Sequence, residues 1–469
     1  MDVSGQSPWW KSSLGLAAWC EPTAKDGKAF FTMRSQSGAG SSRRNRRVRL
    51  AAQSPGSDIP LDGGLTFRRN LLLILNSSTP ADRSDDKHRI RKHAILNVIR
   101  EQGSLSRAEI SKATGFNQRT TTMTVDELVE EGLLLESVST ESRRGRPPIP
   151  LSLNRRAAMV MGIDIGRERT VGRLMDLGGG LIRELELATP PINRPQRFAE
   201  WAAEVGRTTV QETVADFPPL CGIGVGIPNV LERGGRNRLF DKETTAKGIA
   251  EELQKDFDVE VLVDTDAQLM ALGTLWFGAG RRFQNFAVIK LGVSLGVGIV
   301  LNKTLVRGAF GRDMEFGHMP MGEPDAPCYC GSTGCLDTVA CGWGVERMAR
   351  AAGIKVRGVS ELAELARSGH KGALEVFDRF GEVVGRVVAT ILNLYSVEAV
   401  VLSGRLSRAN DLYLEATRRS AKHHALPGAF KRAEIIPSEP NARLAVLGTA
   451  AIVYSHIFHS HHVAVEDLI

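Results

Sequence analysis

The chain has 469 residues, 42% of them hydrophobic and 24% charged, which is the balance of a globular protein long enough for two or three domains. Six cysteines in so long a chain are not the pattern of a secreted disulfide framework. No run reaches the roughly 20 apolar residues of a membrane span, and the start lacks the basic and apolar regions of a signal peptide. Residues 1–155 hold 24 Lys and Arg against 16 Asp and Glu, whereas the rest holds 36 against 37. We therefore expect a cytoplasmic protein whose first third binds a polyanion.

Residues 1–85 are rich in Ser, Gly, Arg and Pro, and their apolar run LLLIL, at 71–75, is isolated. Such a composition buries too little apolar surface to offset the entropy lost on ordering. We expect a disordered basic tail. The segment SSRRNRRVRL, at 41–50, is interpreted as part of a solvated tail, or as residues included because the translation start was placed too early. The alternative is that its arginines contact nucleic acid.

Residues 86–155 have the pattern of a winged helix-turn-helix. Apolar residues at helical spacing predict a first helix, and Ser106 and Glu109 are spaced as the capping box of a second helix that ends at Gly115. Asn117 caps a third helix. Three short helices, with a Gly-containing turn between the second and the third, predict a DNA-binding helix-turn-helix.

The polar start of the third helix (117–122) and the hairpin that follows it are the candidate DNA contacts. The segment 133–154 predicts two strands around a basic, Gly/Pro-containing tip, which is the wing. Short polar side chains and one Arg at a helix N-terminus suit a major groove, and arginines at a wing suit a minor groove or its phosphates. The alternative is a winged helix that contacts protein. The predicted DNA-binding residues are Asn117, Gln118, Arg119, Thr120, Thr121, Arg143, Arg144 and Arg146.

Residues 156–469 alternate short apolar strands with helical stretches, such as 198–215 and 374–395, which is typical of an α/β domain. A domain of this length is expected to form two lobes with a ligand cleft between them. The strand candidates are 157–166, 180–189, 221–228, 259–267, 285–302 and 397–404.

Three Gly-containing turns resemble the nucleotide-binding turns of the actin-like sugar kinase superfamily. The strand that ends Asp164-Ile165-Gly166 resembles the start of the first hairpin, whose turn approaches a nucleotide phosphate. KLGVSLGVGIVLN (290–302) resembles the second such turn, in which glycines allow close backbone approach, and VVLSG (400–404) resembles the nucleotide-side strand. The glycines of the second turn are Gly292, Gly296 and Gly298.

The segment EFGHMPMGEPDAPCYCGSTGCLD, at 315–337, makes the resemblance specific. Its Gly-His pair, a ten-residue step and Cys-x-Cys-Gly-x-x-Gly-Cys resemble the zinc signature of the ROK family of repressors and sugar kinases, and the likeness extends over 86–469. It implies an α/β fold in which an N-terminal winged helix-turn-helix precedes a two-lobed actin-like domain, 156–469. One His and three Cys fit a closed, structural zinc site, with incidental buried thiols as the alternative. The predicted zinc ligands are His318, Cys328, Cys330 and Cys335.

The resemblance also implies a set of sugar ligands. Asp266 matches the Asp that acts as general base in the kinases, although Thr265 stands where the family has Asn. Glu315 matches the Glu of Glu-x-Gly-His, and His318 would contact sugar with one ring nitrogen and zinc with the other. Asp337 stands where the family has a Glu. The alternative is that Asp266 and Glu315 are structural carboxylates.

The nucleotide side departs from the kinases. They continue the first turn with Gly-Thr-Lys, whereas this chain has Arg167-Glu168-Arg169, and a Glu beside a triphosphate would repel it. The sequence therefore predicts a non-enzymatic, sugar-responsive regulator that does not use ATP, more specifically a repressor of carbohydrate-utilisation genes that binds operator DNA as a homodimer. The alternatives are an active ATP-dependent sugar kinase with an appended DNA-binding domain, in which Asp266 is the base, and a scaffold without a ligand.

Overall fold

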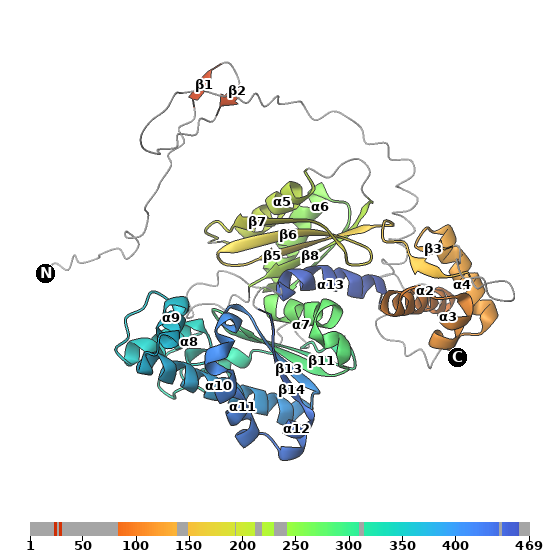
Figure 1. The fold of residues 1–469 in the computed structure, drawn as a ribbon. Helices are drawn as coiled ribbons and strands as arrows, with labels where there is room; N and C mark the ends of the chain where they lie inside the picture. The colour runs from red at the N-terminus through yellow and green to blue at the C-terminus, as the bar shows by residue number, and fades with distance from the viewer. Residues whose placement is uncertain are drawn as a thin grey trace, which may run out of the picture. The chain divides into compact units, whose positions relative to one another are not determined.

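A computed structural model of the protein describes seven ranges of the chain and two short strands near its start (Figure 1). The strands β1 (Thr23–Lys25) and β2 (Lys28–Phe30) pair antiparallel, within the segment predicted to be a basic tail. The remainder of residues 1–82 lies outside the described residues. Contacts divide the chain into two units, residues 1–59 and 60–469, and every element from residue 83 onward belongs to the second unit. The described ranges are 83–137, 149–192, 194–211, 218–228, 242–308, 314–439 and 443–458.

The first module of the second unit is the predicted winged helix-turn-helix. The capping box is present, because Ser106 accepts a hydrogen bond from the amide of Glu109 while the Glu109 carboxylate accepts one from the amide of Ser106. Gly115 ends the second helix with a φ of 75°, a left-handed conformation that favours glycine. The wing tip, 138–148, lies outside the described residues. The elements are α2 (Arg83–Gln102), α3 (Arg107–Thr114), α4 (Gln118–Glu130) and the antiparallel strands β3 (Leu134–Glu136) and β4 (Leu151–Leu153).

Two five-stranded sheets of the same topology follow, and each forms the centre of one lobe. In each, a hairpin and a third antiparallel strand lie on one side, and parallel strands lie on the other. The first sheet has the order β7-β6-β5-β8-β9, with β5 (Met159–Ile165), β6 (Arg169–Asp176), β7 (Leu181–Ala188), β8 (Leu220–Ile227) and β9 (Glu260–Thr265). The second has the order β12-β11-β10-β13-β14, with β10 (Phe286–Leu291), β11 (Leu295–Leu301), β12 (Thr304–Leu305), β13 (Ala399–Ser403) and β14 (Glu434–Pro437).

The predicted strand 285–302 is two strands, because the turn at 292–294 reverses the chain between β10 and β11. Strand β14 was not among the predicted strands. It has four residues at the edge of its sheet, too few to show an alternation of apolar and polar side chains.

The helices cover the sheets in layers (Figure 1). The first lobe has α5 (Pro195–Val210) and α6 (Lys242–Asp256), which pack on each other. In the second lobe, the apolar face of α10 (Lys371–Tyr395) lies in a core shared with β10, β11 and β13. The other helices of the second lobe are α8 (Gly342–Ala351), α9 (Val359–Arg367), α11 (Asn410–His424) and α12 (Pro427–Arg432), with the short 3-10 turns η1 (Ala279–Arg282), η2 (Phe316–His318), η3 (Leu336–Thr338) and η4 (Arg405–Ala409).

Two helices, α7 (Asp266–Phe277) and α13 (Leu444–Phe458), pack together between the sheets (Figure 1). A Cβ at Gly224 of β8 would lie 1.7 Å from the carbonyl oxygen of Thr449, and one at Gly448 would lie 1.7 Å from that of Leu269. Only glycine permits this approach, so α13 packs directly against β8 and α7. Among the residues that the structure describes, no helix combines the length and the apolar character that crossing a membrane requires.

Candidate functional site

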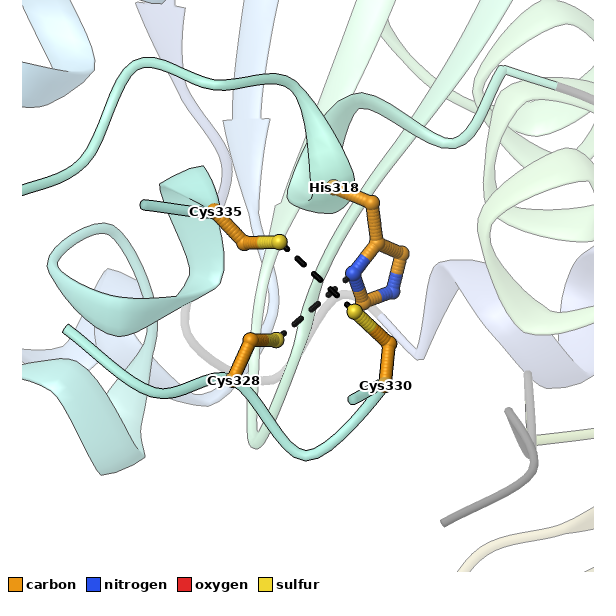
Figure 2. Close-up of side chains that lie close together, drawn as sticks. All are labelled: His318, Cys328, Cys330 and Cys335. Atoms are coloured by element: carbon orange, nitrogen blue, oxygen red, sulfur yellow. Dashed lines mark hydrogen bonds between the residues drawn. The ribbon is translucent and has the colours of Figure 1, made fainter. Parts of the chain in front are cut away.

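Four side chains converge on one point in the second lobe (Figure 2). His318 is the last residue of η2, and Cys328, Cys330 and Cys335 follow it in the next loop. One ligand atom from each residue lies within 4.8 Å of all the others. The distance from His318 Nδ1 to Cys328 Sγ is 3.7 Å, and that from Cys330 Sγ to Cys335 Sγ is 3.6 Å.

These distances fit a shared tetrahedral metal ion. With zinc–sulfur bonds of about 2.3 Å, neighbouring sulfur atoms of a tetrahedral site are about 3.8 Å apart, whereas a disulfide places them about 2.05 Å apart. Burial, with smaller contributions from Cys330 and Cys328, raises the pKa of the Cys335 thiol to about 12. A divalent cation would oppose this shift, because its charge stabilises thiolates.

The glycines of the signature shape the loop that carries the sulfur ligands. Gly331 has a φ of 95° and Gly334 a φ of 71°, so both occupy the left-handed region. The amide of Cys328 donates to the carbonyl of Ser332 over 2.8 Å, and that of Gly331 donates to the carbonyl of Cys328 over 3.1 Å. The residues between the cysteines therefore form a tight turn, and this turn directs the three cysteine side chains to the same side (Figure 2).

The second nitrogen of the His318 ring points away from the cysteines (Figure 2), which is the geometry that the predicted shared role of His318 requires. Glu315 directly precedes η2, is half-buried, and accepts the amide of His318 on its carbonyl over 3.0 Å. These two predicted sugar ligands therefore share one short turn.

Asp337, the fourth predicted sugar ligand, has no exposed surface. Its Oδ1 accepts the amide of Leu295 over 2.7 Å, and its Oδ2 accepts the hydroxyl of Tyr329 over 2.5 Å. A Cβ at Gly317 would lie 2.7 Å from Asp337 Oδ1, so the carboxyl packs directly behind the turn of His318. Each oxygen of Asp337 thus has one hydrogen-bond partner inside the protein, and its direct contact with a sugar stays a prediction.

A cavity of about 860 Å³ lies at the ends of the two sheets. It is lined at its base by Asp164 of β5, Asp266 of α7 and Lys290 of β10, and this volume is ample for a monosaccharide. Of the four predicted sugar ligands, Asp266 is the one that lines this cavity among the described residues.

Opposite charges meet at the base of the cavity. The ammonium of Lys290 donates to Asp266 Oδ2 over 2.6 Å, and the two side chains are 11% and 20% exposed. Asp266 Oδ1 is buried and has no hydrogen-bond partner among the described residues. Burial, and after it the charge of Asp266, raise the pKa of Asp164 to about 7, and the charge of Lys290 opposes the shift. Asp266 thus has one oxygen held by Lys290 and one buried oxygen without a hydrogen-bond partner among the described residues.

Two glycines of the predicted second phosphate turn have a packing role. A Cβ at Gly296 would lie 2.7 Å from Ala267 Cβ, and one at Gly298 would lie 2.6 Å from Ala271 Cβ, so both face α7. Gly292, by contrast, lines the cavity. The sequence predicted backbone approach to a nucleotide for all three, and for two of them the close neighbour is a helix of the protein.

At the mouth of the cavity an ion pair joins the two lobes. Glu168, in the turn after β5, contacts Arg405 of η4 over 3.0 Å, and both side chains are largely exposed. The turn is tight, because the amide of Gly166 donates to the carbonyl of Arg169 over 3.0 Å. The substituted first turn therefore contacts the second lobe directly.

The candidate DNA-binding face is the exposed side of α4. Asn117 caps the helix by accepting the amide of Thr120 over 2.9 Å, and Gln118 and Arg119 are exposed. Thr121, also among the predicted DNA contacts, is fully buried and donates its hydroxyl to the carbonyl of Asn117, so its side chain does not lie on the exposed side of α4.

The helical period explains the burial of Thr121, because position 121 faces the core while 122 and 123 return to the surface. Thr122 is exposed, and Met123, which was not predicted, is 57% exposed. The predicted wing contacts lie outside the described residues; they are Arg143, Arg144 and Arg146.

Comparison with known proteins agrees with this architecture. A sequence model of the ROK family matches residues 160–456, and one of winged helix-turn-helix DNA-binding domains matches residues 89–134. The chain belongs to the ROK family. The xylose repressor of Bacillus spizizenii is 26% identical over 380 residues, which cover 78% of this chain and 96% of the repressor. The Escherichia coli K12 transcriptional dual regulator NagC is 25% identical over 377 residues, or 77% of this chain and 91% of NagC.

ROK kinases are relatives as well. The glucokinase of Halalkalibacterium halodurans is 32% identical over 309 residues, which cover 62% of this chain and 91% of the kinase. A solved ROK transcriptional regulator, a homolog of E. coli MLC protein, has a TM-score of 0.68 at 21% identity over 79% of this chain and 97% of its own. The ROK glucokinase of Streptomyces griseus, in complex with glucose and AMPPNP, has a TM-score of 0.52 at 23% identity over 63% of this chain and 98% of its own. These structural likenesses show the shared fold.

Two residues of the ROK domain that the sequence reasoning missed are Lys290 and Tyr329. Lys290 is the single charge in the otherwise apolar strand FAVIKL, and a charge in a buried strand indicates a partner nearby. Tyr329 lies between two cysteines of the cluster, Cys328 and Cys330, but its hydrogen bond to Asp337 spans a loop, so no local pattern indicates it.

Proposed function

We propose that this ROK protein is a sugar-responsive transcriptional regulator that represses carbohydrate-utilisation genes in the cytoplasm. The proposal is supported by a winged helix with an exposed recognition helix, joined to a ROK domain with a ligand-sized cavity. It is supported also by relatives named for the repression of xylose and N-acetylglucosamine genes. DNA-binding modules of this type read two half-sites as dimers, so the proposed active form is a homodimer on operator DNA.

A monosaccharide or a derivative would bind through groups at the base of the cleft. Asp266 Oδ1 would accept a sugar hydroxyl, because the other oxygen is held by Lys290. Glu315 and the outer nitrogen of His318 are not among the residues that line the cavity, and they would contact a sugar that extends from Asp266 toward the turn of η2. Asp337 remains in the proposed set in another role, in which it holds the wall of the site from behind.

The ion pair of Lys290 and Asp266 is the observation that favours a sugar sensor over a sugar kinase. A general base must be free to accept a proton from the attacking hydroxyl. In this chain one oxygen of Asp266 is occupied by an ammonium at 2.6 Å, while the other can still accept a hydrogen bond. This arrangement favours ligand binding without phosphoryl transfer, as does Glu168 in the turn after β5.

We assign the metal cluster to Zn²⁺, since three thiols and one imidazole are the donors of structural zinc sites. The residues that would hold it are His318, Cys328, Cys330 and Cys335. The ion would fix the turn of Glu315 and His318 relative to the loop that follows. Four protein ligands leave no open position, so its proposed role is structural.

The test is a DNA-binding measurement with sugars present. Operator fragments selected from a genomic library would be labelled, and binding followed by fluorescence anisotropy at fixed salt with D-xylose, D-glucose and N-acetyl-D-glucosamine. We expect sequence-preferring binding, and at least one sugar that raises the melting temperature and changes DNA affinity about tenfold or more. The proposal fails if the protein shows no preference among DNA sequences, or if DNA affinity is the same with and without every sugar.

The second candidate is an active sugar kinase. It is favoured by the position of Asp266 and by the 32% identity to a glucokinase. A coupled assay of ATP turnover with the same sugars tests it. Phosphorylation that disappears in Asp266→Asn would establish the kinase and overturn a sensor-only role.

A further inference from the structure

One short turn lines the cleft and is held at both ends by the segment that follows the metal cluster. The turn, residues 292–294, connects β10 to β11, and all three residues line the cavity. The amide of Gly342, at the start of α8, donates to the carbonyl of Gly292 over 2.8 Å. At the other end, the amide of Leu295 donates to Asp337 Oδ1 over 2.7 Å.

Tyr329 connects this anchored turn to the metal cluster. It lies between the ligands Cys328 and Cys330, and its hydroxyl donates to Asp337 Oδ2 over 2.5 Å. Its ring meets that of His318 edge to face, with centroids 5.4 Å apart, and that of Trp343 at 6.4 Å. Any movement of the metal loop therefore moves the donor that holds Asp337.

A carboxylate is planar, so holding one oxygen sets the direction of the other. Tyr329 holds Oδ2 of Asp337, and Oδ1 holds Leu295. The backbone of Asp337 is fixed as well, because the thiol of Cys341 donates to its carbonyl over 3.0 Å. With the backbone fixed, the hydroxyl of Tyr329 and the amide of Leu295 together hold the carboxylate rotamer, and through it Tyr329 acts on the Leu295 end of the turn.

The position of the turn affects Lys290 and Asp266, the charged pair at the base of the cleft. The side chain of Lys290 lies across the turn, since a Cβ at Gly292 would be 3.6 Å from Lys290 Cε. Lys290 in turn holds Asp266. A shift of the turn would therefore change the orientation of Asp266 Oδ1, the oxygen proposed to accept a sugar hydroxyl.

We infer that Tyr329 is a positioning residue that transmits the state of the metal cluster to the wall of the ligand cleft, through Asp337 and Leu295. The inference rests on the proposed sugar-binding function and adds a regulatory link to it: metal occupancy sets ligand affinity. The alternative is that the ring of Tyr329 packs between its aromatic neighbours and its hydroxyl contributes to stability alone.

The experiment compares Tyr329→Phe with Tyr413→Phe in the full chain. Tyr413 is a matched control because its hydroxyl also donates over 2.5 Å, to Asn410, in the α11 region of the same lobe. Metal content, sugar affinity by calorimetry and hydrogen exchange of the peptide that contains residues 292–295 are measured before and after zinc removal by a chelator. The sugars are D-xylose, D-glucose and N-acetyl-D-glucosamine.

We expect Tyr329→Phe to retain one zinc per chain, to bind the sugar about tenfold more weakly, and to exchange the Leu295 amide about tenfold faster. Zinc removal should produce similar changes in the native protein and little further change in Tyr329→Phe, because the link is already broken. Tyr413→Phe should respond to the chelator as the native protein does.

The two proposals fail in different ways. If the native protein binds sugar, and Tyr329→Phe matches Tyr413→Phe in affinity and exchange, the link is overturned while the proposed function stands. Equal effects of zinc removal in all three proteins also overturn it. If the native protein binds none of the three sugars but exchange at 292–295 depends on zinc and on Tyr329, the proposed function fails and the link stands.

Discussion

Lys290 of β10 and Asp266, the first residue of α7, form an ion pair of 2.6 Å at the base of the cleft, where both side chains are mostly buried. Breaking a buried pair is costly because the remaining charge keeps its desolvation without its partner. We expect Lys290→Met to lower the free energy of unfolding by about 2 kcal/mol, less than for a fully buried pair because both side chains retain some exposure.

The measurement is urea denaturation of Lys290→Met, Asp266→Asn and the double variant at one pH. The double variant should lose less than the sum of the two single losses, since either change alone leaves an unpaired group. Lys255→Met is the control, because Lys255 pairs with Glu252 on the surface and its loss should change the free energy of unfolding far less than that of Lys290. Strictly additive losses would show that the pair contributes nothing to stability.

Asp164 gives the cleft a pH dependence. Burial raises its pKa from the ordinary 3.8 to about 7, so the folded protein keeps a proton there that the unfolded chain releases. With more protons bound in the folded state, stability falls as pH rises from about 4 to about 7. The whole effect is about 4 kcal/mol at most, from about 1.4 kcal/mol for each pKa unit.

The matched comparison is Asp164→Asn, which keeps the shape of the side chain and cannot ionise. We expect the variant to gain stability relative to the native protein as pH rises over this range, and the difference to level off above pH 7. Unfolding free energies from pH 4 to pH 8 provide the measurement. A difference between the two proteins that is constant with pH would contradict the raised pKa.

Substitution of a cysteine in the metal cluster is expected to lower zinc content and thermal stability. Cys335→Ser should release zinc and lower the melting temperature by about 5 °C or more, because a closed zinc site contributes directly to folding. Cys221→Ser is the control, since Cys221 is equally buried but lies in the other lobe. Zinc content per chain separates the two variants even if both lose stability, and equal zinc content in both would contradict the assignment.

The sequence predicted the groups that lie close together along the chain and missed those that the fold brings together. His318, Cys328, Cys330 and Cys335 lie within one segment, so their spacing alone indicated a common metal. The partner of Lys290, in contrast, comes from a different element, and no periodicity indicates which carboxylate it meets.

The side chains of two predicted site residues point in directions that the sequence did not predict, for different physical reasons. Thr121 belongs to a polar run, and only the phase of the helix, set by its cap at Asn117, turns it into the core. Asp337 follows the family pattern in sequence, but its carboxyl is bonded to Tyr329 and Leu295 across a loop and between strands. Composition and the family pattern identified Thr121 and Asp337, whereas the direction of their side chains depends on tertiary packing.

The exposed face of α4 predicts a graded response of DNA affinity. Arg119→Ala should weaken operator binding and reduce the slope of log affinity against log salt by about 1, because one phosphate contact is lost. Thr121→Ser is the control, since Thr121 is buried and should leave affinity within about twofold. Anisotropy titrations at several salt concentrations provide the measurement, and an unchanged salt slope in Arg119→Ala would refute a phosphate contact.

Arg100 of α2 stacks on Trp276 of α7, with its guanidinium carbon 4.1 Å from the centre of the Trp276 ring. Trp276 also stacks with Tyr454 of α13, with centroids 5.8 Å apart. Helix α7 has 12 residues and is roughly 18 Å long. It carries Asp266, the proposed sugar ligand, at its start and Trp276, which contacts the DNA-binding module, near its end. A rigid helix with a group at each end can couple the two sites.

Arg100→Ala should therefore reduce the effect of sugar on DNA affinity several-fold, while sugar affinity without DNA stays within about twofold. Arg100→Lys is the informative comparison, because lysine keeps the charge but loses the planar stack on the indole ring. If stacking couples the domains, Lys will behave like Ala; if charge alone matters, Lys will behave like the native protein. The coupling is measured as the ratio of DNA affinities with and without saturating sugar, and a native ratio in both variants would exclude this contact as the route.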